Sequence, residues 1–196
     1  MTQANGRTAH HDIDAQFLHR WSPRAFTGEA LPLAELMKIL EAGRWAPSAF
    51  NGQPWRFVYA LRDTPAWDVL LGLLIPYNQA WAVNAGALVF ICSDRLMRRE
   101  GKEPTASLSH SFDAGAAWGM IALQAHASGW AAHGMLGFDR GRAHEELKLP
   151  EDWKIEAAVA IGRQADRSVL PEAYREREVP SDRRPLSELV HEGPFT

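Results

Sequence analysis

The stretch from Ser111 to Trp130 constrains the fold most, because it is the longest segment with helical character. Small residues recur along it: Ala114, Gly115, Ala116, Ala117, Gly119, Ala122, Ala125 and Ala127. Small side chains let another helix approach closely. The apolar residues are not confined to one face, which is typical of a buried helix. We therefore predict a central buried helix here, and a subunit interface is one place where it could lie.

The rest of the chain alternates helices with strands but contains few regular βαβ units. Hydrophobic periodicity predicts helices over 12–21, 33–45, 65–74, 77–84 and 142–149. It predicts strands over 55–61, 87–92 and 155–161, with a strand and a loop over 130–137. This pattern favours an α+β fold in which a mixed sheet is flanked by helices that pack on it.

A single domain is expected for residues 1–196, because no internal repeat or linker divides the chain. Residues 1–11 are polar and predict a flexible tail. Residues 94–110 form a charged, irregular insertion. Residues 163–196 hold many charges and four prolines, which predicts an extended arm and not a second domain.

The composition excludes several classes of function. The chain has 46% apolar residues and a formal net charge of -3, without the run of Lys and Arg that captures nucleic acid. The polar N-terminus lacks a signal core, and no apolar run could span a bilayer. Cys92 is the only cysteine, which excludes an intramolecular disulfide and a cysteine-based zinc site. We expect a cytoplasmic protein with no metal, membrane or nucleic-acid partner.

Common catalytic motifs are missing as well. The sequence has no G-x-G-x-x-G after a strand, no G-x-x-x-x-G-K-[ST] phosphate loop and no G-x-S-x-G elbow. Cys92 lies within an apolar strand, where an inert thiol is expected. If the protein is an enzyme, its difficult chemistry therefore belongs to a cofactor.

Two basic segments are candidates for binding an anion. In Arg20-Trp21-Ser22-Pro23-Arg24-Ala25-Phe26, two arginines and a serine alternate in a turn. Guanidinium groups bind phosphate bidentately and serine adds a hydroxyl donor, although arginines after a helix also simply cap carbonyls. Arg183-Arg184-Pro185-Leu186 is the other basic segment and the third of the three candidate segments in chain order, and its alternative interpretation is a solvated basic pair.

The second segment in chain order concentrates rigidity and polarity in ten residues, Ala46 to Trp55, with the sequence Ala-Pro-Ser-Ala-Phe-Asn-Gly-Gln-Pro-Trp. The two prolines fix the bends of the loop, so the Ser, Asn and Gln side chains can be held in place for a ligand. The alternative is a rigid turn that only leads into the following strand.

Together the three segments resemble signatures of the nitroreductase (flavin reductase) family. The first resembles R-x-S-x-[RK]-x-F, the second A-P-S-x-x-N-x-Q-P-W-x-F, and the third the closing basic-Pro-Leu segment. The similarity runs roughly from Asp14 to Val190. It implies a homodimer with FMN at the interface. Such a protein passes electrons from NADH or NADPH to a small organic acceptor, a nitroaromatic or a quinone, by a ping-pong mechanism.

The resemblance assigns the basic residues to one end of the FMN. Arg20 and Ser22 would hold the phosphate and the ribityl chain, and Arg183 would be a second phosphate ligand, with Arg184 as the alternative. Arg24 would face the N1 and O2 edge of the flavin. A cation there stabilises the anionic reduced flavin.

The polar loop residues are assigned by the same resemblance to the flavin of the partner subunit. Pro47, Ser48 and Asn51 would reach that flavin, and Gln53 either joins them or braces the loop. Asn78 matches a position that hydrogen-bonds the pyrimidine ring.

The last assigned segment is Met135, Leu136 and Gly137. It would lie beneath the isoalloxazine, with a backbone N–H that points at N5. Leu136 stands where the family has Glu. Trp21, which we include among the cofactor contacts, stands where a second basic residue is common. Arg24 is often a Lys in the family. These departures leave FMN implied and the substrate open.

No catalytic side chain is predicted, because hydride would pass between nicotinamide and flavin without a protein nucleophile. Two alternatives remain. The same fold could serve reductive dehalogenation or breakdown of the flavin, with residues 94–110 as a lid, or the protein could be a non-enzymatic flavin carrier.

Overall fold

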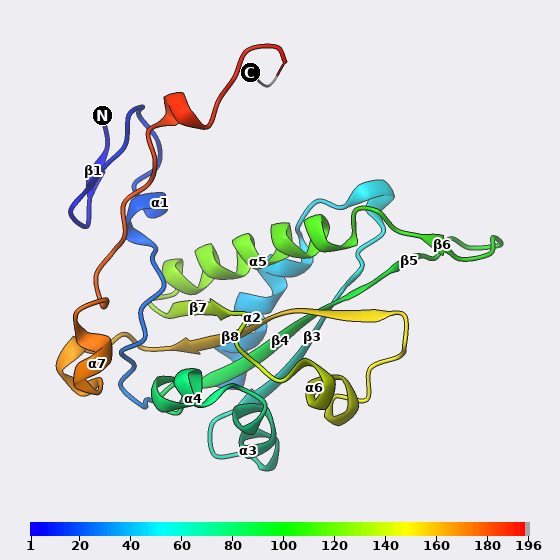
Figure 1. Cartoon of the computed structure of the whole chain (residues 1–196), viewed down its shortest axis with the longest axis horizontal. Coiled ribbons are helices and arrows are strands. Elements are labelled where there is room, and N and C mark those ends of the chain that lie inside the picture. The colour runs from blue at the N-terminus through cyan, green and yellow to red at the C-terminus, as the bar shows by residue number, and fades with distance from the viewer. Residues whose placement is uncertain (195–196) are drawn as a thin grey trace.

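The core of the protein is a four-stranded sheet, seen in a computed structural model that describes residues 1–194 (Figure 1). Its strands, in spatial order, are β3 (Trp55–Leu61), β4 (Ala87–Asp94), β8 (Trp153–Gly162) and β7 (Ala131–Met135). The α+β class is confirmed. Each of the three pairings is antiparallel, so this sheet is not the mixed sheet that we predicted. The chain enters β4 at the edge where β3 ends, whereas parallel pairing needs a crossover to the opposite edge.

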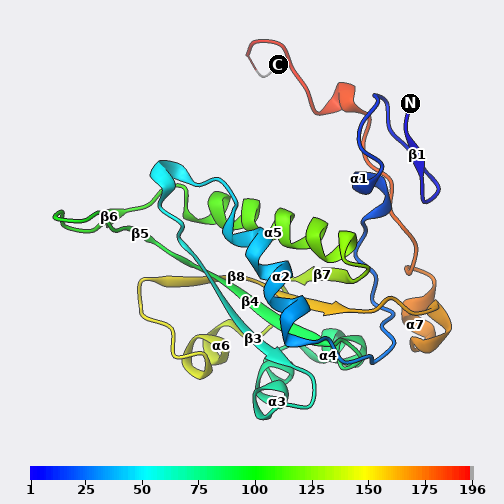
Figure 2. The same ribbon diagram turned by 180° about the vertical axis from the view of Figure 1, so that it is seen from behind.

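Helices cover both faces of the sheet. One face carries α2 (Leu33–Arg44) and α5 (His110–Ala127), and the other carries α3 (Pro65–Gly72), α4 (Pro76–Ala82) and α6 (Arg140–Glu146) (Figures 1 and 2). The predicted helices and strands are thus present, with ends displaced by a few residues.

The central strand β4 explains the continuous apolar run in the sequence. Leu88, Phe90 and Cys92 pack into the layer of α3, α4 and α6. Val89 and Ile91 pack in the opposite direction, against α2 and α5. Since successive side chains of a strand point to opposite faces, a strand covered on both sides needs apolar residues at every position.

Helix α5 is buried on one face only, which corrects the prediction of burial on all sides. Its inner residues pack against α2 and the sheet: Ala114, Ala117, Ile121 and Ala125. On the opposite face Phe112 is 82% exposed, and no atom lies within 4 Å of the position that a Cβ would take on Gly115 or Gly119. An exposed apolar helix face of this kind is a candidate surface for contact with another molecule.

The N-terminus differs from the predicted flexible tail. Two short strands, β1 (Gln3–Ala4) and β2 (Arg7–Thr8), form a hairpin around Asn5 and Gly6. Both turn residues have positive φ, 55° and 73°, as Asn-Gly hairpin turns require. The helix predicted over 12–21 is reduced to α1 (Gln16–His19), because the Asp14 carboxylate accepts the Gln16 N–H just before it.

The insertion and the arm also contain local structure. Residues 94–110 include a two-stranded ribbon, β5 (Leu96–Met97) with β6 (Thr105–Ala106), that projects from the sheet (Figure 1). The arm begins with a 3₁₀ turn and α7 (Glu172–Arg175) and then runs beside α1 and the N-terminal hairpin (Figures 1 and 2). A last 3₁₀ turn covers Leu186–Glu188, and positions 195–196 of the predicted arm lie outside the described residues.

Candidate functional site

The first and third sequence segments meet at one cavity of about 310 Å³. Its lining includes five of the predicted contacts: Arg20, Trp21, Ser22, Arg24 and Arg183. The Arg20 guanidinium donates to the Ser22 hydroxyl over 3.4 Å. The arm thus brings Arg183 to the loop after α1, although 160 positions of sequence separate them.

The charge in this cavity is unbalanced. Burial lowers the pKa of Arg20, and the neighbouring charges of Arg183 and Arg7 lower it further. Within residues 1–194, no carboxylate lies within 4.0 Å of the Arg20 or Arg183 guanidinium. Arg183 bonds only to its own turn, for example to the Asp182 carbonyl at 3.0 Å. Clustered guanidinium groups without a carboxylate fit a bound phosphate.

Arg24 lies in a different electrostatic environment, next to the buried Glu178 of the arm. One Glu178 oxygen accepts the backbone N–H groups of Arg24 and Ala25, at 2.7 and 2.8 Å. The other lies 3.6 Å from the Arg24 guanidinium. This carboxylate fixes the position of the loop and of its second arginine. Sequence reasoning missed Glu178, because no local pattern marks a contact across 154 positions.

His133 of β7 is a second residue of the cavity that the sequence did not reveal. Its Nδ1 lies 3.0 Å from the Pro23 carbonyl, and its ring centroid lies 4.7 Å from that of Trp81. Burial lowers the pKa of His133 to about 4; the bond to Pro23 opposes this shift, and the charge of Arg24 adds to it. The ring is therefore neutral at pH 7 and donates Nδ1–H to the loop that carries Arg24.

The second segment forms a strained loop. Phe50, Asn51 and Gln53 have positive φ values of 52°, 54° and 46°, which non-glycine residues rarely adopt. The Ser48 hydroxyl accepts the Gln53 N–H at 3.0 Å, and the Gln53 amide donates to the Asn51 carbonyl at 3.1 Å. Gln53 therefore braces the loop. Strain of this kind is typical of ligand-binding segments.

This loop and the arginine cavity lie at opposite ends of α5. The buried Asp113, in the first turn of α5, accepts the Ala49 N–H at 3.3 Å. At the other end, His126 stacks on His19, which directly precedes the first segment, with ring centroids 6.1 Å apart. At a rise of 1.5 Å per residue, the positions between Asp113 and His126 span about 20 Å. A single chain therefore keeps the two segments apart (Figure 1).

The remaining predicted residues meet where β7 ends. The Asn78 amide donates to the Gly137 carbonyl at 2.9 Å. A Cβ on Gly137 would lie 2.6 Å from the Asn78 amide nitrogen and 2.7 Å from Ile75, so any larger residue would have to displace these two side chains. Met135 is buried in the core, and Leu136 is 67% exposed. Asn78 thus holds the loop whose backbone N–H groups we predicted to face the flavin.

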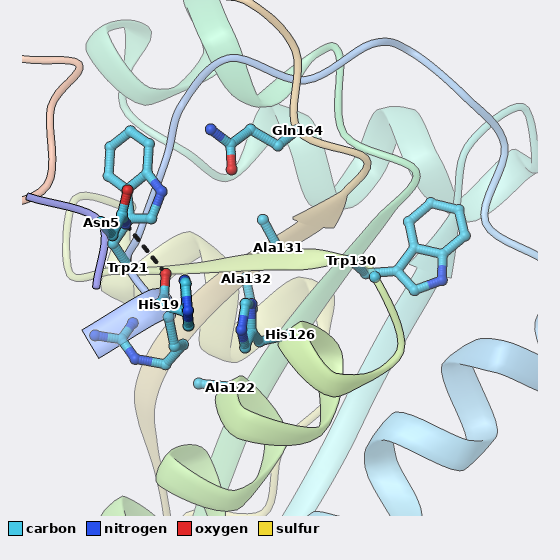
Figure 3. Close-up of a pocket in the computed structure, with 11 residues that line it drawn as sticks. Asn5, His19, Trp21, Ala122, His126, Trp130, Ala131, Ala132 and Gln164 are labelled. Carbon is cyan, nitrogen blue, oxygen red and sulfur yellow. Dashed lines mark hydrogen bonds between the residues drawn. The ribbon is translucent and has the colours of Figure 1, made fainter. Parts of the chain in front are cut away.

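A further cavity of about 340 Å³ lies on the other side of Arg20 and Trp21 (Figure 3). Figure 3 shows His19 and His126 side by side, with the Asn5 amide donating to the His19 carbonyl at 3.3 Å. Burial lowers the pKa of His126, as do the neighbouring His19 and Arg20. In the described part of the chain no group of three or more potential ligands could hold a metal ion.

Sequence similarity connects this chain to known proteins. A model of the Nitroreductase family matches residues 18–66, which include the first two segments. An NADH dehydrogenase of Thermus thermophilus is 30% identical over 91% of this chain and 95% of its own length. The chain belongs to the nitroreductase family.

Solved structures extend the likeness of this nitroreductase-family chain to its whole length. An oxidoreductase containing FMN is 49% identical, with a TM-score of 0.97 over 100% of this chain and 99% of the other. A protein of Desulfovibrio desulfuricans in complex with FMN is 30% identical, with a TM-score of 0.71 over 96% and 100%. Across residues 1–194 of this oxidoreductase, none of the helices combines the length and the apolarity of a membrane span.

The buried neutral His133 predicts a loss of stability in mild acid. The unfolded chain takes up this proton near pH 6.5 and the folded chain only near pH 4. The contribution of neutral His133 to the free energy of unfolding is therefore complete above pH 6.5 and is lost as the pH falls toward 4. Between pH 7 and pH 5 we expect a loss on the order of 2 kcal/mol, measured by urea unfolding. His133→Asn, which keeps a side-chain N–H but does not titrate, should lose correspondingly less. Equal losses in both proteins would contradict the assignment.

Proposed function

We propose that this protein is an FMN-dependent oxidoreductase that passes electrons from NADH or NADPH to a small organic acceptor by a ping-pong mechanism. The observation that carries the proposal is the cavity where Arg20, Ser22 and Arg183 gather, with no carboxylate of residues 1–194 within 4.0 Å of either guanidinium. Bound FMN would supply the redox chemistry, accepting a hydride from the nicotinamide and returning electrons to an acceptor such as a quinone or a nitroaromatic. The FMN content of a structure 49% identical to this chain supports the same cofactor here.

The arginines of the cavity have separate tasks. Arg20 and Arg183 bind the phosphate of FMN, because both lack a carboxylate partner, and Ser22 adds a hydroxyl. Arg24 faces the flavin ring, and Glu178 keeps its guanidinium from turning toward the phosphate. The loop of Gly137, held by Asn78, presents a backbone N–H to the ring. No side chain acts as a nucleophile.

The partner subunit completes the site. The second segment and the arginine cavity lie near opposite ends of α5 within one chain, so two copies must combine for Pro47, Ser48 and Asn51 to reach the same flavin. The apolar side chains for such an interface are exposed near that segment: Trp45, Phe50, Leu108 and Phe112. Together with the open face of α5 they form a surface that suits a homodimer.

A spectrum of the purified protein tests the proposed cofactor and reaction. We expect a yellow protein whose flavin band bleaches on addition of NADH or NADPH under argon and returns on addition of a quinone. A flavin that the nicotinamide leaves oxidised would indicate a carrier and contradict the enzymatic proposal. A protein with no FMN affinity below millimolar would contradict the cofactor itself.

A mixture of two defective subunits tests whether the site is split between chains. Arg20→Gln removes the first segment's phosphate contact and Asn51→Ala removes a contact of the second. In a mixed dimer one site carries both changes and the other carries none. We expect unfolding and refolding of the mixture to restore about a quarter of the wild-type sites when the subunits pair at random. If the site lay within one chain, the mixture would bind no better than its two components.

The proposed place of Arg24 predicts a change in redox potential. A cation beside the flavin favours the reduced, anionic form, and a contact to a charged group is worth about 1.5–3 kcal/mol. Arg24→Gln should therefore lower the midpoint potential of bound FMN by about 30–60 mV. Arg20→Gln should mainly weaken binding, because the phosphate charge does not change on reduction. A redox titration at saturating FMN compares the variants, and an unchanged potential in Arg24→Gln would remove Arg24 from the reaction.

A further inference from the structure

Arg7 of the N-terminal hairpin is a buried arginine outside every motif described above. Its side chain reaches from β2 to the loop after α1, where Nη2 lies 3.4 Å from the Arg20 carbonyl. The residue is only 8% exposed. Its Nε is enclosed and has no hydrogen-bond partner within residues 1–194, and its Nη1 makes no hydrogen bond there either.

The charges around Arg7 do not compensate its own. Arg7 and Arg183 line the same cavity of about 560 Å³ between the hairpin and the arm, and no carboxylate of the described residues comes within 4.0 Å of the Arg7 guanidinium. Burial lowers the pKa of Arg7 and so does the charge of Arg183, while the charge of Asp182 opposes them. A buried cation among other cations is unfavourable unless an anion joins them.

A purely structural role explains Arg7 poorly. A side chain that only attached the hairpin to the Arg20 carbonyl would need one hydrogen-bond donor and no charge. An uncharged side chain could supply that donor without leaving a buried Nε unpaired. Arg183 lines both the cavity of Arg7 and that of Arg20, and the charges of Arg7 and Arg183 both act on Arg20. Three neighbouring guanidinium groups, from β2, from the loop after α1 and from the arm, would supply the donors that a phosphate dianion accepts. Arg20 and Arg183 already line the cavity that we assign to the cofactor phosphate.

We propose that Arg7 is a third arginine of the phosphate site, so that the N-terminal hairpin closes over the terminal phosphate of the cofactor. This inference rests on the proposed function. It assigns the first eleven residues, which carry no family signature, a role in selecting a phosphorylated flavin. The ligand class is a flavin with a terminal phosphomonoester, distinguished from one that ends in a hydroxyl.

The test compares FMN with riboflavin, which has the same ring and ribityl chain but lacks the phosphate. Equilibrium binding of both is measured by fluorescence quenching with full-length wild type, Arg7→Gln and Arg7→Lys. We expect Arg7→Gln to weaken FMN binding by about tenfold or more, since a tenfold change corresponds to about 1.4 kcal/mol. Riboflavin binding should change less than about twofold, within ordinary scatter for a site not touched. Arg7→Lys, which keeps the charge, should recover part of the loss.

A matched control is Arg62→Gln. Arg62 also donates to backbone carbonyls, those of Val83 and Ala85, but lies away from the cavity, so its loss should leave both affinities unchanged. Equal weakening of FMN and riboflavin in Arg7→Gln would overturn the proposal and indicate that Arg7 only holds the hairpin. An unchanged FMN affinity would overturn it as well. Failure of wild type to bind FMN would instead refute the proposed function.

Discussion

The pairing of β4 with β8 is the constraint on which the rest of the structure depends. Both strands run through the middle of the sheet and bury apolar side chains on two faces, so helices must cover both. The layer of α2 and α5 closes one side and α3, α4 and α6 close the other. The functional residues then lie at the margins of this core, on loops that the two layers hold at fixed positions.

The sequence allowed correct prediction of elements whose signal is local. The strand 55–61 was found with its observed ends, because apolar alternation and the prolines before it are short-range patterns. The two-residue strands of the hairpin were not predicted, because their pairing depends on the Asn5-Gly6 turn and not on periodicity. The burial of α5 was overestimated, because composition does not reveal which face another element covers.

The site shows the same division between local and distant information. The first segment predicted an anion site, and the structure brings its arginines and Arg183 to one cavity. Glu178 and His133 were missed, because each acts on that segment across more than a hundred positions of sequence. Both residues reach that segment only in the folded chain. The Glu178 carboxylate accepts two backbone N–H groups, and the neutral His133 ring donates to a carbonyl.

The C-terminal arm has a consequence for how such a protein can diverge. Glu178 accepts the backbone N–H groups of Arg24 and Ala25, and Arg183, five positions later, lines the cavity that Arg24 also lines. The arm thus meets the loop of Arg24 at two fixed positions, Glu178 and Arg183. Insertions before Glu178 or after Arg183 leave this spacing intact, whereas a single residue gained or lost between them displaces one of the two charges. We therefore expect that short interval to tolerate a change in length less well than the rest of the arm.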